Sequence, residues 1–152
     1  MKLYKLLSPV ALALFVVNGF GIAPQEKRWL SYGPEVVEIE GKLIEQSRYG
    51  PPNFGENPRT DSKVRVPLLI LFVPVGVHRD PRDATNSEVK EVRRIQLLLY
   101  EIPHKRLMGK RVLVKGTLFH ANTGGHYTDV VMSVRSIRPI GLKRRETLKT
   151  GK

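Results

Sequence analysis

The chain has 152 residues, a length that suits one domain, and it contains no cysteine. We therefore expect neither disulfides nor a lipid-modified cysteine, so the fold depends on its hydrophobic core alone. The formal net charge is +12, from 26 Lys and Arg against 14 Asp and Glu. This charge favours acidic partners such as phospholipid head groups, nucleic acid, anionic glycans or an acidic protein, the alternative being a solvated basic surface that aids solubility.

The first 23 residues have the order of a secretory signal peptide. A basic start at residues 1–5 precedes an apolar run at residues 6–17 and then the small-residue stretch "NGFGIAP". The apolar run is shorter than the roughly 20 residues that a membrane-spanning helix needs. We therefore expect residues 1–23 to direct export, to the periplasm or beyond, and no stable membrane span after cleavage; an uncleaved signal anchor is the alternative.

Composition divides the rest of the chain into three parts. Residues 24–35 are predicted to be a polar linker, in which Trp29 and Leu30 are placed to tuck against the following domain. Residues 36–140 are predicted to be the folded domain, and residues 141–152 a basic disordered tail. The signal region and the tail account for half of the net charge of +12, which leaves about +6 on residues 24–140.

Three segments of the domain show the alternation of apolar and polar residues that is typical of half-buried strands. They are residues 36–46, 110–120 and 127–140. The residues predicted to face inward are Val37, Ile39, Gly41, Leu43, Val112, Val114, Gly116, Leu118, Val130, Met132 and Val134.

Two further strands are predicted from apolar runs. Residues 68–73 are expected to be buried on both faces, bracketed by Pro67 and Pro74 because proline cannot donate to a strand ladder. Residues 88–100 fit both periodicities, and their β-branched residues favour a strand in the second half. A connector with one 3₁₀ turn, ending at Gly109, follows.

Five strands with a glycine inside the first and the fourth suit an all-β fold of the small, five-stranded OB-like Greek-key barrel type. Gly41 and Gly116 would permit the sharp coiling that closes such a barrel. A plain β-sandwich or an open barrel is the alternative.

A long loop at residues 47–62 separates the first two predicted strands. Its segment "YGPPNFGEN" is stiffened by two prolines, which lowers the entropic cost of holding one shape. The loop would then present a recognition surface made of Tyr49, Asn53, Phe54 and Glu56. The alternative is structural: Phe54 and Tyr49 plug the mouth of the barrel while Asn53 caps a turn.

The stretch "LFHANTGGHYTDVVMSV", residues 118–134, is predicted to be two strands around a tight turn. Its candidate ligand-contacting residues are His120, Thr123, His126, Tyr127 and Asp129. Zinc or copper needs three or four ligands, and this stretch offers two imidazoles, His120 and His126, and one carboxylate. A metal site, a ligand-contacting hairpin and a purely structural tip all remain open.

No catalytic motif is present: there is no G-x-S-x-G elbow, H-E-x-x-H pair or P-loop. Asp129 and Glu56 would form an acid–base pair only if their loops approach each other. We therefore expect no enzyme and no cofactor. Single-stranded nucleic acid is a further alternative partner, although the strands lack interleaved aromatic residues.

Four segments together resemble a bacterial exported family, domain of unknown function 4431. They are "GPPNFGE", "IQLLL", "LMGKRVLVKGTLFHANTG" and "HYTDVVMSV", and the resemblance would span about Val36 to Ile137. It implies export, one small β-rich domain and two loops of interest, but no activity. In that family consecutive histidines commonly follow Thr-Gly. Here Gly125, His126 and Tyr127 stand there, which puts a metal-binding turn in doubt.

These observations together predict an exported binding or accessory module of the bacterial envelope. It would recognise a protein or an anionic ligand through its loops at residues 50–56 and 120–129. The alternative functions are a zinc or copper site in the hairpin and the binding of single-stranded nucleic acid. The oligomeric state is left open.

Overall fold

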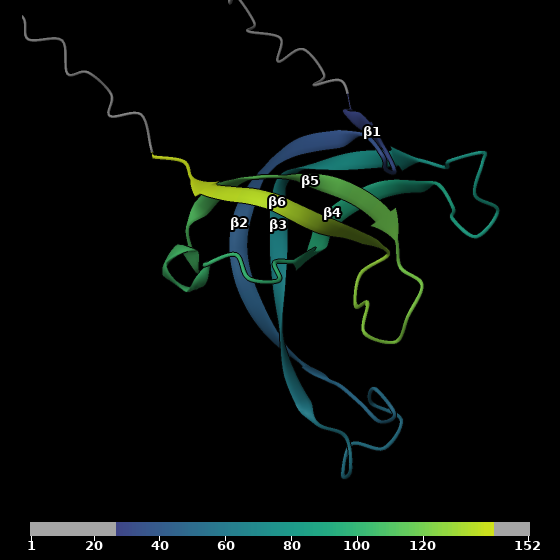
Figure 1. Ribbon diagram of the computed structural model, residues 1–152, viewed down its shortest axis with the longest axis vertical. Coiled ribbons are helices and arrows are strands. Elements are labelled where there is room, and N and C mark those ends of the chain that lie inside the picture. The colour runs from purple at the N-terminus through teal and green to yellow at the C-terminus, as the bar shows by residue number, and fades with distance from the viewer. Residues whose placement is uncertain (1–26, 142–152) are drawn as a thin grey trace, which may run out of the picture.

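The computed structural model describes residues 27–141, so the predicted signal peptide and nearly all of the predicted tail lie outside the described residues. The described part is all-β, with six strands and one short 3₁₀ helix (Figure 1). The elements are β1 (Trp29–Ser31), β2 (Val36–Tyr49), β3 (Lys63–His78), β4 (Val89–Leu98), η1 (Lys105–Leu107), β5 (Arg111–His120) and β6 (Val130–Pro139). Within residues 27–141, no helix is long and apolar enough to cross a membrane.

All six strands belong to one sheet, in the order β1-β3-β2-β5-β6-β4, and β4 also pairs with β3. The pairs β2–β3, β2–β5, β3–β4 and β5–β6 are antiparallel, whereas β4–β6 and β1–β3 are parallel. The strand β2 serves two partners: its residues 36–42 pair with β5 and its residues 41–49 with β3.

The core lies on the inward faces of these strands, as the alternation predicts. Every apolar residue that was predicted to face inward from the three alternating segments is buried. Gly41 and Gly116 mark two close approaches between strands. A Cβ on Gly41 would lie 2.5 Å from the carbonyl oxygen of Ile70, and one on Gly116 would overlap the carbonyl oxygen of Ser133. Gly41 is also where β2 passes from β5 to β3, and the β5–β6 register shifts at Gly116.

The segment predicted to be a polar linker contains a strand. Trp29–Ser31 pairs in parallel with residues 76–78 of β3. The reason is packing: Leu30 is buried, and the ring of Trp29 stacks on the ring of His78 with centroids 4.4 Å apart. The linker prediction is therefore wrong for these residues, although the expected contact of Trp29 and Leu30 with the domain is present.

The strand β3 is longer than its apolar run, and its two prolines lie inside it. Pro67 lies where β3 pairs with β2 alone. Residues 68–73 were predicted to be buried on both faces, but Phe72 is 55% and Val73 45% exposed, so this burial ends before Phe72. Both residues fall in the interval where the ladder between β3 and β4 shifts register, between Ile70 and Val75. By contrast, the segment at residues 88–100 forms a strand from Val89 to Leu98, so its first half is a strand as well as its second.

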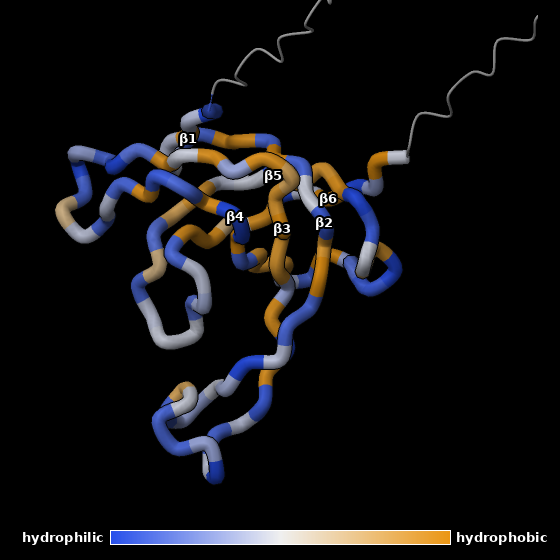
Figure 2. Tube along the Cα trace, turned by 180° about the vertical axis from the view of Figure 1, so that it is seen from behind, coloured by the Kyte–Doolittle hydropathy of each residue, from blue (hydrophilic) through white to orange (hydrophobic). Residues whose placement is uncertain are grey.

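Beyond the core, the ends of β2 and β3 continue as a two-stranded arm that carries the loop at residues 50–62 (Figure 1). Apolar residues gather in the body of the domain, whereas the end of this arm is largely polar (Figure 2). The arm is therefore a projection from the core, with little apolar surface of its own to bury.

Candidate functional site

The loop between β2 and β3 (residues 50–62) contacts the loop between β5 and β6 (residues 121–129). The Tyr127 hydroxyl donates a hydrogen bond to the Tyr49 carbonyl oxygen at 2.7 Å. The ring of Phe54 lies so close to Gly124 that a Cβ there would come within 2.9 Å of a ring carbon. These contacts join the two loops that the sequence singled out, and we call residues 50–62 and 121–129 together the rim.

Loop 50–62 is held from within by Asp61, which is only 8% exposed. Its carboxylate accepts hydrogen bonds from the backbone N–H groups of Asn53 at 2.9 Å, Gly55 at 2.7 Å and Asn57 at 3.2 Å. The Asn53 side-chain amide adds a fourth, at 3.2 Å. Burial by itself would raise the pKa of Asp61, but these donors outweigh burial and hold the pKa below its usual value.

The loop that Asp61 organises presents Phe54 and Glu56 to solvent. Phe54 is 42% exposed and has φ of 52°, in the left-handed region that few bulky residues adopt. It rests on Gly124, so it does not plug the interior as one interpretation of the sequence required. The Tyr49 ring lies below Lys63, whose Nζ is 3.5 Å from the ring centroid.

Loop 121–129 is held from outside, by Gln96 of β4. This side chain is 5% exposed and uses both ends of its amide. Its Oε1 accepts a hydrogen bond from the backbone N–H of Tyr127 at 2.6 Å, and its Nε2 donates to the Gly125 carbonyl oxygen at 3.0 Å. The Gln96 backbone N–H donates to the Thr128 hydroxyl oxygen at 2.9 Å. Three groups of loop 121–129 are thus fixed by one residue of β4.

The predicted tight turn is instead a nine-residue loop. A bond from the His126 N–H to the Thr123 carbonyl oxygen, at 3.0 Å, forms one turn within it. A bond from the Ala121 N–H to the Asp129 carbonyl oxygen, at 3.0 Å, closes its base. The second strand was predicted to begin at Tyr127 but begins at Val130, because Gln96 and Thr128 hold residues 125–128 in the loop conformation.

The two histidines of the hairpin are both engaged in local contacts. The His120 Nδ1 lies 2.9 Å from the Ala121 carbonyl oxygen, and its Nε2 lies 3.0 Å from the Ser87 hydroxyl. The His126 Nδ1 accepts from the Asn122 backbone N–H at 3.2 Å. Among residues 27–141, no three His, Cys, Asp or Glu side chains come together in a group that could hold a metal ion.

A third loop, residues 79–88, meets the base of the rim through Ser87. The buried Tyr32 donates a hydrogen bond from its hydroxyl to the Ser87 carbonyl oxygen at 3.1 Å, and Ser87 also contacts His120. Burial raises the pKa of Tyr32 to about 12, and the negative charge of Asp129 adds to this effect. Asp129 therefore acts on the base of the rim and is not paired with Glu56 by any hydrogen bond within the described residues.

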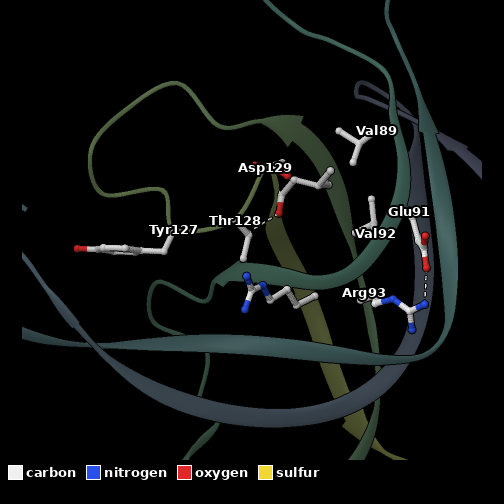
Figure 3. A pocket seen from close by; sticks show the side chains of 9 residues that line it. Val89, Glu91, Val92, Arg93, Tyr127, Thr128 and Asp129 are labelled. Atoms are coloured by element: carbon white, nitrogen blue, oxygen red, sulfur yellow. Dashed lines mark hydrogen bonds and ion pairs between the residues drawn. The ribbon is translucent and has the colours of Figure 1, made fainter.

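A cavity of about 390 Å³ lies between β4 and the end of loop 121–129 (Figure 3). The side chains of β4 line one side, and Thr128 and Asp129 line the other, while the ring of Tyr127 points away (Figure 3). Arg93 is paired with Glu91. Arg94 also lines the cavity and has no ion pair within residues 27–141. The lining therefore carries two basic side chains, Arg93 and Arg94, and two acidic ones, Glu91 and Asp129, and its formal charge is zero.

The two residues that organise the rim, Gln96 and Asp61, were not among the predicted site residues. Gln96 is the polar residue inside the apolar run "IQLLL", and a polar side chain at a buried strand position signals a required hydrogen-bond partner. Asp61 lies at the end of a long loop, where a carboxylate commonly accepts from nearby backbone N–H groups.

The family model described as "Domain of unknown function (DUF4431)" matches residues 94–138. The match confirms the resemblance over the end of β4, η1, β5, loop 121–129 and most of β6. It is shorter than the predicted span from Val36, and loop 50–62 lies outside it. No curated protein matches the chain.

Proposed function

We propose that the protein is an exported binding or accessory module of the bacterial envelope. Its rim would recognise a protein or an anionic ligand. The observation that carries this proposal is the preformed contact between two loops that are far apart in the sequence. The Tyr127 hydroxyl and the Phe54 ring tie them together. A surface held in one conformation before binding loses less entropy when a partner docks.

We further propose that the sheet is an OB-like Greek-key barrel. The pairing order supports this: five strands, β2 to β6, pair in a series that returns from β4 to β3, with the one parallel pair among them between β4 and β6. In OB-type barrels, the loop between the first two strands and the loop between the last two flank the ligand-binding face. In β2–β6 those loops are residues 50–62 and 121–129.

The rim's own residues sum to a formal charge of −2, from Arg59 against Glu56, Asp61 and Asp129, so an anionic ligand would be held by the basic side chains that flank the rim. Arg94 lines the cavity beside Thr128 and has no ion pair within residues 27–141. Lys63 lies over the Tyr49 ring, at the base of loop 50–62. A charge-driven complex of this kind weakens as ionic strength rises, because salt screens exposed charges. The nucleic-acid alternative has less support, since Phe72 is the only Phe, Tyr or Trp in β3 and β4.

The test is affinity capture from envelope extract with three forms of the protein as bait. In the rim variant, Phe54→Asn and Thr123→Glu change exposed residues and leave the hydrogen bonds of Asp61 and Gln96 in place; asparagine tolerates the left-handed backbone at position 54. In the control variant, Ala84→Glu makes the same change of charge at an exposed residue of loop 79–88.

We expect the unchanged protein and the control variant to retain the same partner, and the rim variant to lose it. Loss should also occur on raising the salt concentration. Protease treatment of the extract then distinguishes a protein partner from an anionic ligand that is not a protein, because protease destroys only the protein. Equal capture by the rim variant would refute the proposal that the rim is the binding surface.

A further inference from the structure

A second surface feature lies at the connector between β4 and β5. Tyr100 is 76% exposed, the most exposed of the large hydrophobic side chains within residues 27–141. Its φ is 42°, in the left-handed region. A bulky residue in this region is an outlier that costs free energy, and such strain persists only where the surrounding structure imposes it. The connector therefore holds an aromatic ring out into solvent.

Beside Tyr100 lies a groove of about 690 Å³, formed by the connector and the end of β6. Its apolar lining includes Ile102, Leu107 and Ile137, which pack against the core but are only partly buried. The groove thus adds accessible apolar surface to the exposed ring.

The charge around this groove is positive. Lys105 and Arg106 line it, and neither has an ion pair within residues 27–141. Glu101 is the acidic residue of the lining. The groove also includes Pro139, the last residue of β6, and the sequence continues from there into residues 141–152, whose net charge is +4. The sequence therefore continues from the groove into a basic segment.

We propose that this surface, made of Tyr100, Ile102, Lys105, Arg106 and Leu107 and called here the basic groove, binds the surface of an anionic lipid bilayer. Tyrosine favours the boundary between hydrocarbon and water because its ring is apolar and its hydroxyl polar. Long basic side chains cover apolar surface with their stems and reach lipid phosphates with their charges. An acidic peptide would account for the charges, but not for the exposed aromatic ring of Tyr100.

The basic groove and the rim lie at opposite ends of β6. Loop 121–129 precedes Val130, the first residue of this strand, and the groove includes Pro139, the last. At about 3.3 Å per residue the two ends are roughly 30 Å apart. Figure 1 shows η1 and the end of β6 on one side of the sheet and both rim loops toward the other. Contact with a bilayer through the groove would leave the rim open, so this inference stands apart from the proposed function.

The test is cosedimentation of the full chain with lipid vesicles. One set contains phosphatidylcholine alone, and the other contains about one third phosphatidylglycerol. The groove variant carries Lys105→Glu and Arg106→Glu. Its matched control carries Arg79→Glu and Lys90→Glu, which change the charge equally at exposed positions in and beside loop 79–88. Residues 1–23 are common to all forms, so their contribution cancels when the groove variant is compared with the control.

We expect the unchanged protein to prefer the anionic vesicles and to lose this preference between about 0.05 M and 0.5 M salt. The groove variant should bind at least about 25-fold more weakly, since losing each basic residue near an anionic surface costs roughly five-fold and each glutamate adds repulsion. The control should stay within about two-fold of the unchanged protein. Tyr100→Asn should weaken binding about three-fold. The melting temperature should not fall, because asparagine tolerates the left-handed backbone at this position.

Two results would overturn the proposal. One is the absence of any preference for anionic vesicles at low salt. The other is equal weakening in the groove and control variants, which would reduce the effect to overall charge. Poly-glutamate serves as a second probe: if it binds the unchanged protein but not the groove variant while vesicles do not bind, the occupant is an acidic polypeptide and the lipid proposal is wrong.

Discussion

The two loops of the rim are fixed in opposite ways. Loop 50–62 carries its own organiser, because Asp61 binds three backbone N–H groups of the same loop. Loop 121–129 depends on Gln96, a residue of β4 that lies about 30 positions earlier in the chain. The first loop can therefore form its shape before the sheet is complete, whereas the second takes its shape only when β4 and β6 are paired.

The largest effect is expected at Gln96. Replacement by leucine leaves the Tyr127 N–H and the Gly125 carbonyl without their partners, which should lower the free energy of unfolding by roughly 2–4 kcal/mol. Gln96→Glu keeps an acceptor for the N–H but buries a carboxylate beside the Gly125 carbonyl oxygen, so it should cost at least as much. Urea denaturation measures both, with Gln46→Leu on β2 as the matched control. A leucine variant as stable as the control would contradict the role given to Gln96.

Asp61→Asn should loosen loop 50–62 and leave loop 121–129 largely in place. Amide hydrogen exchange at Asn53, Gly55 and Asn57 should accelerate by about ten-fold or more, because charged acceptors form stronger hydrogen bonds than neutral ones. The Tyr127 amide should change little. Equal acceleration in both loops would show that they form one cooperative unit.

The same comparison can be made by changing pH. The pKa of Asp61 lies below its usual value of about 3.9, so its hydrogen bonds stabilise the loop above that pH and are lost as pH falls through the lower folded value. The NMR shifts of the Asn53, Gly55 and Asn57 amide protons should therefore move together below about pH 4. The Tyr127 amide, held by a neutral acceptor, should not follow them.

Tyr127→Phe tests the connection between the two loops. It removes one hydrogen bond, to the Tyr49 carbonyl oxygen, and should cost about 1 kcal/mol of unfolding free energy. Tyr100→Phe changes an exposed hydroxyl and serves as the control. Combined with Asp61→Asn in a double-mutant cycle, the Tyr127 change should show a coupling energy if the loops support each other. Additive costs would mean that they are independent.

The smallest effect concerns Asp129 and Tyr32. Since burial and then the Asp129 charge raise the pKa of Tyr32 to about 12, Asp129→Asn should lower that pKa slightly in an absorbance titration. An unfolded tyrosine ionises near pH 10, so the stability linked to Tyr32 is fully present below about pH 10 and is lost as pH rises through about 12. An unchanged titration in the variant would place Asp129 too far away to act.

The strands could be predicted from the sequence because period-two alternation reports burial directly. Three alternating segments gave the correct inward faces, and the glycines at positions 41 and 116 lie at close approaches between strands. The strand at Trp29–Ser31 has no such signal, since three residues are too few to alternate and its pairing with β3 is a long-range contact. The length of β3 could not be predicted either. Pro67 and Pro74 indicated the ends of the strand, but prolines are tolerated where a strand lacks a second partner.

The candidate site was predictable as two loops, but their contact was not. The bond between Tyr127 and Tyr49 joins positions 78 residues apart, and no local pattern signals it. Gln96 was visible only as a polar residue in an apolar run, which indicates that a partner exists without naming it. The Asp61 network, by contrast, spans eight residues and follows from local hydrogen-bonding preferences.

The central claim is that the rim is a preformed surface that contacts a partner in the envelope. Its most direct test is photo-crosslinking in living cells, with a photoreactive amino acid placed at Glu56 or Thr123 in the rim, or at Ala84 in loop 79–88 as the control; all three positions are exposed. We expect a discrete adduct from both rim positions and none from Ala84. No adduct from the rim, or the same adduct from all three positions, would contradict it.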